Sequence, residues 1–287
     1  MPASSAGDPA RYIGSEDPHE AERQAAHATG VLDELRAGLA LHPPIPAARV
    51  VELGCGAGNV TQALLEAQPE ATIVATDRDE RLLAQARERL ADAVRMGRVR
   101  FERADATSLP FPARTFDLAI CRCVLMHLSD PLLAVAEMYR VLEVGGVAVA
   151  VEPDWGARAL YPDPEALGAL LDLARRARPF GFPDMLLGRK LYALFRAAGF
   201  GDVSIATLAS SATGADFGAL TEEERMERGP WRLLDQAHPT LLQAGVSDEE
   251  IDALKARLQA VYRHPERFSA GMDFAASGMK PAPALTE

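Results

Sequence analysis

Short apolar runs alternate with amphipathic stretches from residue 49 onward, which is the pattern of a parallel β-sheet covered by helices on both faces. The runs are short and rich in β-branched residues, and this favours strands. Five strands are predicted at residues 49–53, 72–76, 99–102, 116–120 and 147–151. Two more are predicted at 203–208 and 271–277, so we expect an α/β fold on a seven-stranded sheet.

Helices are predicted between and around these strands. Apolar residues recur every three or four positions in residues 59–67, 80–91 and 131–142, as in crossover helices. Asp17-Pro18-His19-Glu20 combines an N-cap residue, a proline at the first helical position and a capping-box acid, so a helix is predicted to begin there. Further helices are predicted after Asp163-Pro164 and over 187–198.

A long insertion separates the last two predicted strands. It has helical character and contains a capping box at Ser247-Asp248-Glu249-Glu250. It is far longer than a hairpin needs, and we interpret it as a substrate-covering cap. The predicted organisation is N-terminal lid helices over 1–46, a ligand-binding core over 47–210, a helical cap over 211–270, and the last strand with a tail over 271–287.

The strongest chemical signal is a glycine-rich turn at the end of the first predicted strand. Gly54, Gly56 and Gly58 alternate there, and such a turn lets the backbone approach a ligand closely. The dinucleotide fingerprint needs Gly or Ala three residues after Gly56, but Asn59 stands there. The carboxylate of Glu52 also opposes a pyrophosphate and favours a ligand that carries an ammonium and a sulfonium.

A second carboxylate follows the second predicted strand. Asp77 lies where its oxygens can accept hydrogen bonds from both hydroxyls of a ribose. Glu52, Leu53 and the three glycines make residues 49–152 resemble the class I S-adenosylmethionine-dependent methyltransferases, whose signature is an acidic residue, one apolar residue and Gly-x-Gly-x-Gly. The segments 103–106, 109–111 and 116–120 also follow the pattern of that family.

The resemblance implies a Rossmann-like, mostly parallel seven-stranded sheet with helices on both faces and a helical cap inserted before the last strand. It also implies S-adenosyl-L-methionine as the cofactor. By resemblance, Gly54 to Gly58 surround the methionine moiety and Asp77 holds the ribose. Glu52 is counted among the cofactor-binding residues because of its charge and its place in the signature. The resemblance also implies that Asp105 and the Ala106 amide contact the adenine and that Arg78 borders it. The Cys121 backbone would bind the amino group of the cofactor.

The N-terminal segment resembles the lid of a subgroup of small-molecule methyltransferases. Tyr12, Arg23 and His27 are the residues that would contact the cofactor there. A glutamine more often occupies the place of His27 in that subgroup. Arg23 and His27 are four residues apart, so they also fit a solvated helix face, and both interpretations stay open.

Three residues near the carboxyl ends of the fourth and fifth strands are candidates for catalysis. His127 suits a general base, or it holds the loop that follows the fourth strand. Glu152 and Asp154 leave the fifth strand at the edge where ligands bind in open α/β sheets. Either carboxylate can orient a hydroxyl or amine of the substrate, or cap the following segment.

The expected reaction is methyl transfer to an O, N or C nucleophile of a small, partly apolar molecule, such as those of secondary metabolism. The protein mainly aligns the nucleophile and excludes water, so a strong base is not required. Three alternatives stay open: a non-methylating reaction such as a cyclisation assisted by the sulfonium, an NAD-dependent oxidoreductase, and a scaffold with an inactive site.

Composition narrows the partners. The 41 acidic and 30 basic residues give a net charge of −11, which repels a phosphate backbone. Cys121-Arg122-Cys123-Val124 also replaces the Asn/Asp-Pro-Pro-aromatic motif of DNA and glutamine methyltransferases. We therefore expect a small-molecule substrate and no nucleic acid. No run approaches the roughly 20 apolar residues of a membrane span, and we expect a cytoplasmic protein. The three cysteines are expected to be reduced, and no metal site is expected. A homodimer is compatible with a capped domain that offers apolar helix surface.

Overall fold

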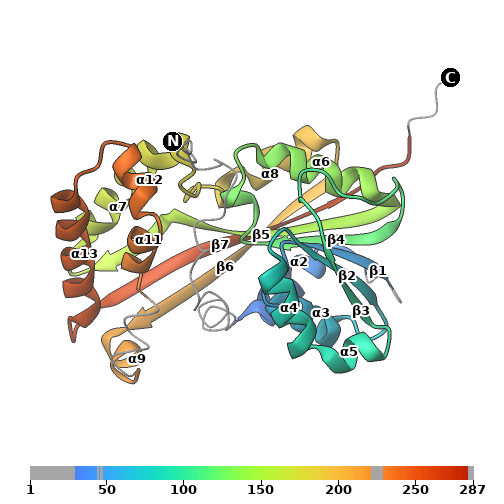
Figure 1. The fold of residues 1–287 in the computed structure, drawn as a ribbon, viewed down its shortest axis with the longest axis horizontal. Helices are drawn as coiled ribbons and strands as arrows, with labels where there is room; N and C mark the ends of the chain where they lie inside the picture. Colours follow the sequence, from blue (N-terminus) through green and yellow to red (C-terminus); the bar gives the residue numbers. More distant parts are fainter. Residues whose placement is uncertain (1–29, 44, 46–47, 221–228, 284–287) are drawn as a thin grey trace, which may run out of the picture.

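A seven-stranded sheet runs through the part of the molecule that the computed structural model describes, which is residues 30–43, 45, 48–220 and 229–283 (Figure 1). The strand order is β3-β2-β1-β4-β5-β7-β6. The strands are β1 (Arg49–Leu53), β2 (Thr72–Asp77), β3 (Val99–Arg103), β4 (Phe116–Arg122), β5 (Leu142–Tyr161), β6 (Gly201–Thr213) and β7 (Phe268–Met279).

The first five strands are parallel, and β7 pairs antiparallel with both β5 and β6. At the centre of the sheet, Val51 lies beside Val74 of β2 and Ala119 of β4. The apolar runs of β1 and β4 are buried on both sides because helices cover both faces. The prediction of a Rossmann-like, mostly parallel seven-stranded sheet is confirmed.

Helices form a layer on each face of the core (Figure 1). α2 (Val31–Leu39), α3 (Asn59–Ala67), α4 (Glu80–Arg89) and α5 (Ala91–Arg95) belong to one layer, where Leu35, Leu64 and Leu83 are buried. α6 (Pro131–Val141) and α8 (Leu191–Ala198) cover the other face with Met138 and Phe195. Two short 3-10 helices, η2 (Leu125–His127) and η4 (Gly188–Lys190), lie next to this second layer.

The last three strands extend by several residues beyond the bounds that the sequence pattern predicted. β5 continues ten residues beyond the predicted end at Val151, β6 ends at Thr213 instead of residue 208, and β7 begins at Phe268 instead of residue 271. The distal parts pair with one another, so that Phe268 lies beside both Tyr161 and Thr213. The extension lacks a continuous apolar run because much of its surface is only half-buried or exposed, and it therefore left little signal in the sequence.

A helical cap packs on these distal strands at the end of the molecule away from α3 and α4 (Figure 1). It contains α9 (Gly214–Gly218), α11 (Trp231–Gln236), α12 (His238–Gln243) and α13 (Asp248–Arg263). α13 begins as predicted, because the Ser247 hydroxyl accepts a hydrogen bond of 3.2 Å from the Glu250 amide. α7 (Pro164–Ala177) and η3 (Arg178–Phe180), which follow β5, join the cap through the buried residues Leu170, Phe182, Leu234, Leu241 and Leu258.

The aromatic contact beneath α8 yields a test of the core. Phe195 is fully buried, and its ring centroid lies 5.1 Å from that of Phe200. Phe195→Ala should lower the free energy of unfolding by about 3–5 kcal/mol in urea denaturation, because the lost contacts leave a cavity. The control is Tyr192→Ala on the same helix, whose residue is 53% exposed and should change stability by no more than about 0.5 kcal/mol. Equal losses in the two variants would contradict this description of the core.

Candidate functional site

The glycine turn lies between the carboxyl end of β1 and the first turn of α3. Gly54, Gly56 and Gly58 have φ values of 68°, 53° and 84°, all in the left-handed region that favours glycine. A Cβ on Gly54 would overlap the Val124 side chain, and one on Gly58 would lie 3.2 Å from the Ala86 Cβ. The turn therefore needs glycine for its backbone conformation and for the close approach of its neighbours.

Glu52 is a buried carboxylate directly beneath this turn. Its Oε2 accepts a 2.6 Å hydrogen bond from the Thr61 hydroxyl, whereas its Oε1 is buried with no hydrogen-bond partner among the described residues. Burial raises the pKa of Glu52 to about 8, the nearby charge of Asp77 adds to this shift, and the Thr61 hydroxyl opposes it. A free acceptor in a buried, acidic position fits a cationic group such as an ammonium.

Asp77 connects the end of β2 to the glycine turn. One carboxylate oxygen accepts from the Gly56 amide at 2.9 Å, and the other accepts from the Asp79 amide at 2.9 Å. Burial raises the pKa of Asp77, although these two amide hydrogen bonds oppose the shift. Each oxygen keeps a second lone pair, so the carboxylate can still accept from the hydroxyls of a ribose.

The predicted adenine residues lie at the neighbouring strand ends. Asp105 is exposed beyond the end of β3, and its carboxylate accepts from the amide and hydroxyl of Thr107, which lowers its pKa. Ala106 follows it and is half-buried, while Arg78 is exposed after β2, and its carbonyl accepts from Arg103. Cys121 lies in β4 between Leu53 and Ala150, with its side chain fully buried. The three cysteines form no disulfide.

Glu152 anchors the loop that follows β4. Its Oε1 accepts from the amides of Val124 at 2.8 Å and Leu125 at 2.7 Å, at the start of η2. Its Oε2 is buried with no hydrogen-bond partner in the described part of the chain. Burial raises the pKa of Glu152 to about 8 against the effect of the loop amides. His127 ends η2, is half-buried, and its amide donates to the Val124 carbonyl.

Asp154 is held by an arginine. Its two oxygens accept from the Arg189 guanidinium at 2.6 and 2.7 Å, and the Arg189 amide donates a third bond of 3.1 Å. Burial disfavours the charged carboxylate, but these bonds and the charge of Arg189 outweigh it and lower the pKa of Asp154. The structure thus brings His127, Glu152 and Asp154 to the carboxyl ends of β4 and β5. Their catalytic roles stay predictions.

An ion pair that the sequence did not predict joins α2 to this edge. Arg122, the last residue of β4, donates to the two oxygens of Glu34 at 2.5 and 3.2 Å, and both side chains are largely buried. The partners are 88 residues apart in the chain, so no local pattern could have paired them. Tyr12, Arg23 and His27 of the predicted lid, and the predicted helix start at 17–20, lie outside the described residues.

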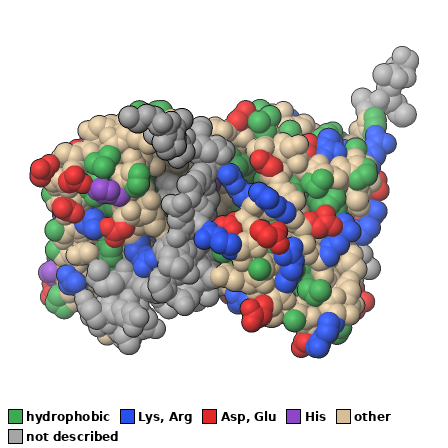
Figure 2. All heavy atoms as spheres, in the orientation of Figure 1, with side chains coloured by type: hydrophobic (Ala, Val, Ile, Leu, Met, Phe, Trp, Pro, Cys, Tyr) green, Lys and Arg blue, Asp and Glu red, His purple; other side chains and the backbone are tan. Residues whose placement is uncertain are grey.

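The surface of the core carries both signs of charge. Figure 2 shows acidic and basic side chains interspersed over this end of the molecule. The ion pairs of the core include Arg87–Glu80, Arg81–Asp79 and Arg100–Glu102. Within the residues described, no helix is long and apolar enough to cross a membrane, and no group of three potential ligands could hold a metal ion.

Comparison with known proteins defines the class of this domain. Residues 51–150 match the model of a methyltransferase domain. The chain is 35% identical to a trans-aconitate 2-methyltransferase of Variovorax paradoxus over 50% of its own length and 52% of that protein. It is 33% identical to a ubiquinone/menaquinone biosynthesis C-methyltransferase of Teredinibacter turnerae over 37% of its length and 43% of that protein. The chain spans about half the length of the curated relatives that it matches.

Solved structures show the same fold. The alignment with the YcgJ protein of Bacillus subtilis covers 89% of this chain and 99% of YcgJ, with a TM-score of 0.56 at 20% identity. Phosphoethanolamine N-methyltransferase 2 of Haemonchus contortus, in complex with S-adenosylhomocysteine, has a TM-score of 0.56 at 17% identity and covers 98% of this chain and 62% of its own. The alignment with the cyclase SpnF has a TM-score of 0.51 at 20% identity and covers 87% of this chain and 82% of SpnF.

The fold is Rossmann-like, with a glycine turn after its first strand. Residues 51–150 match the model of a methyltransferase domain, and the predicted resemblance to S-adenosylmethionine-dependent methyltransferases is confirmed for this part of the chain.

The crowding at Gly54 leads to a stability test. Gly54→Ala should destabilise the protein more than Gly145→Ala, because both positions have positive φ but a Cβ at Gly145 would meet nothing within 4 Å. The left-handed conformation costs about 1–2 kcal/mol in each variant, and the overlap with Val124 should add about 1–3 kcal/mol at Gly54. Urea denaturation measures both values. Losses of the same size would show that Val124 does not restrict the turn.

The pKa of Glu52 leads to a pH test. The folded chain keeps a proton on Glu52 up to about pH 8, whereas an unfolded carboxyl loses it near its ordinary value of 4.5. Glu52 therefore lowers stability progressively as pH rises through this window. Glu52→Gln should gain unfolding free energy relative to the wild type as pH rises from about 5 to about 8, by at most about 1.4 kcal/mol per pH unit. The control is Glu66→Gln at an exposed position of α3, which should show no such gain between pH 5 and pH 8. A stability difference between Glu52→Gln and the wild type that does not change with pH would refute the raised pKa of Glu52.

Proposed function

We propose that this protein transfers a methyl group from S-adenosyl-L-methionine to a small molecule. The observation that carries the proposal is the buried Glu52 Oε1, which has no hydrogen-bond partner among the described residues and lies beneath a glycine turn tied to Asp77. A dinucleotide would place a pyrophosphate at such a turn, where a buried acidic group is unfavourable. A cofactor with an ammonium and a sulfonium suits this position instead.

The residues divide the binding task. Gly54, Gly56 and Gly58 let the backbone approach the methionine moiety, and Glu52 supplies the acceptor for its ammonium. Asp77 accepts from the ribose hydroxyls while it holds the Gly56 amide, so that the cofactor and the turn are positioned by one carboxylate. When bound, S-adenosyl-L-methionine supplies an electrophilic methyl carbon on a positively charged sulfur.

The residues beyond β4 and β5 position the acceptor. Glu152 fixes the loop of Val124 and Leu125, and this loop carries His127 to the ligand-binding edge of the sheet. We assign His127 the role of accepting a proton from the acceptor, and Glu152 and Asp154 the role of fixing the walls, since their oxygens already bind loop amides and Arg189. Alignment and exclusion of water supply most of the rate enhancement in a displacement of this kind.

The identity of the acceptor does not follow from the relatives. One is named for trans-aconitate and another for ubiquinone and menaquinone biosynthesis, and each match covers half of this chain or less. A cyclase shares the fold as well, so the fold alone does not decide whether a methyl group moves. Release of S-adenosylhomocysteine from a panel of small hydroxyl, amine and carbon acids separates methyl transfer from cyclisation.

The decisive binding experiment is calorimetric titration with S-adenosyl-L-methionine and, in parallel, with NADH. We expect micromolar binding of S-adenosyl-L-methionine alone. Asp77→Ala should weaken it by about 10- to 100-fold, because two charge-assisted hydrogen bonds are lost. The matched control is Asp117→Ala, which removes a carboxylate from the opposite, amino-terminal edge of the sheet, where it binds Arg49. Binding of NADH alone, or unchanged affinity in Asp77→Ala, would overturn the proposal.

A further inference from the structure

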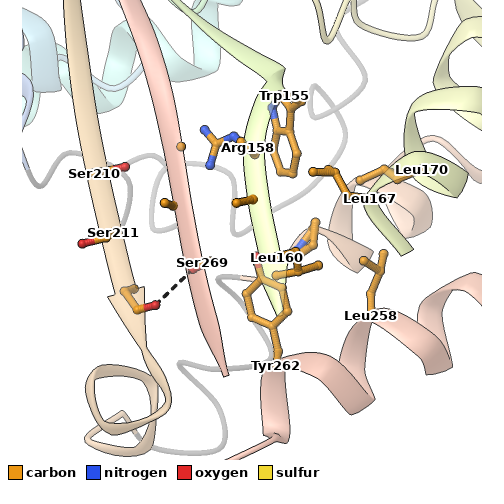
Figure 3. Close-up of a pocket in the computed structure, with 15 residues that line it drawn as sticks. Trp155, Arg158, Leu160, Leu167, Leu170, Ser210, Ser211, Leu258, Tyr262 and Ser269 are labelled. Atoms are coloured by element: carbon orange, nitrogen blue, oxygen red, sulfur yellow. Dashed lines mark hydrogen bonds between the residues drawn. The ribbon is translucent and has the colours of Figure 1, made fainter. Parts of the chain in front are cut away.

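The cap and the distal parts of β5, β6 and β7 line a cavity of about 250 Å³ (Figure 3). Leu167 and Leu170 of α7 and Leu258 of α13 point toward β5 from one side. Trp155 and Tyr262 line the cavity with aromatic rings. The walls are therefore mainly apolar and come from both the sheet and the cap, which is the usual composition of a small-molecule site.

Three serines, Ser210, Ser211 and Ser269, and one guanidinium interrupt these apolar walls. Arg158 lies 4.5 Å above the centre of the Trp155 ring, which holds it by a cation–π contact. Its Nη2 donates to Asp273 at 3.2 Å, but its Nε is buried and has no hydrogen-bond partner in the described part of the chain. A buried donor without an acceptor is unfavourable, so a ligand group that accepts from this nitrogen would be stabilised at this site.

The charges around the cavity limit what that group can be. A second guanidinium, Arg267, is buried 4.4 Å from the centre of the Tyr262 ring and donates to the Ser269 hydroxyl. Asp273 beside Arg158, and Asp216, whose charge acts on Arg267, offset these two positive charges. A dianion such as a phosphate would be repelled more strongly by Asp273 than a single carboxylate, which suits Arg158 with its buried Nε donor.

The cavity also lies close to the proposed reaction edge. Trp155 follows Glu152 by three residues on β5, which corresponds to about 10 Å along an extended strand. Trp155 and Arg158 thus form the end of the cavity nearer the core, and Leu258 and Tyr262 lie toward the far end (Figure 3). A ligand held by Arg158 would have its polar end directed toward the cofactor domain and its apolar body in the cap.

We propose that this cavity binds a small monocarboxylic acid, with its carboxylate at Arg158 Nε and its apolar body between Trp155, Leu170 and Tyr262. We identify this acid as the methyl acceptor, and this assignment rests on the proposed function. Arg158 is then a specificity-determining residue, and the aliphatic and aromatic walls set the size of the acceptor.

Octanoate and octan-1-ol, which differ only in the head group, are suitable probes for calorimetry and for quenching of tryptophan fluorescence. The wild type should bind octanoate at least about 10-fold more tightly than octan-1-ol, since a charge-assisted hydrogen bond distinguishes them. Arg158→Met keeps the length of the side chain and should reduce this ratio to near one, without weakening octan-1-ol. Arg257→Met, which removes a surface guanidinium paired with Asp163, should leave the ratio unchanged.

A filled cavity provides the second variant. Leu167→Trp should weaken both probes about equally, and thermal unfolding of each variant reports whether it is folded. Absence of octanoate binding, equal affinity for the two probes, or an unchanged ratio in Arg158→Met would overturn the proposed ligand class.

The acceptor role is tested separately with S-adenosyl-L-methionine and a panel of carboxylic acids and their matching alcohols. Release of S-adenosylhomocysteine should favour the acids, and Arg158→Met should lower kcat/KM for them at least about 10-fold with unchanged affinity for the cofactor. Equal turnover of acids and alcohols would overturn the acceptor assignment. If the protein does not bind S-adenosyl-L-methionine at all, the proposed function fails, while the octanoate result still decides whether the cavity is a carboxylate site.

Discussion

Strand β7 is hydrogen-bonded on both sides along its length, and the arrangement of the cofactor domain and the cap depends on this double pairing. Its final residues lie between the parallel core strand β5 and the edge strand β6, where Ala275 and Ala276 are buried. Its first residues carry the cap-facing wall around Ser269 and Gly271. Because the same backbone continues through both parts, the distance between the glycine turn and the cap cavity is set by strand geometry and does not rely on a flexible linker.

Buried carboxylates at the carboxyl edge of the sheet meet three different environments. Glu52 keeps one oxygen without a partner, Glu152 binds two loop amides, and Asp154 is neutralised by Arg189. Glu52 and Glu152 each leave one buried oxygen without a partner among the described residues, and a positively charged ligand group would favour the ionised form of such a carboxyl. The loop amides on Glu152 and the Asp154–Arg189 pair fix the backbone and side chains beside these oxygens.

Local signals in the sequence predicted the features that depend on a few adjacent residues. The alternating glycines indicated the turn, the apolar runs indicated the strands, and Ser247 with Glu250 indicated the start of α13. Features that join distant segments were not predicted: the Arg122–Glu34 pair, the packing of α7 into the cap, and the approach of Arg158 to Asp273. These contacts depend on strand order and on the extension of β5, which a half-buried surface does not reveal through hydrophobic periodicity.

The inserted part of the cap leaves and re-enters the sheet at two facing residues, Thr213 of β6 and Phe268 of β7. In terms of chain topology it is a loop at the tip of a hairpin, and doubling the length of such a loop adds only about 0.6 kcal/mol of closure entropy. During evolution, this insertion can therefore lengthen, shorten or be exchanged without a shift in strand register. The glycine turn would remain unchanged while the chemistry that the cavity accepts diversifies.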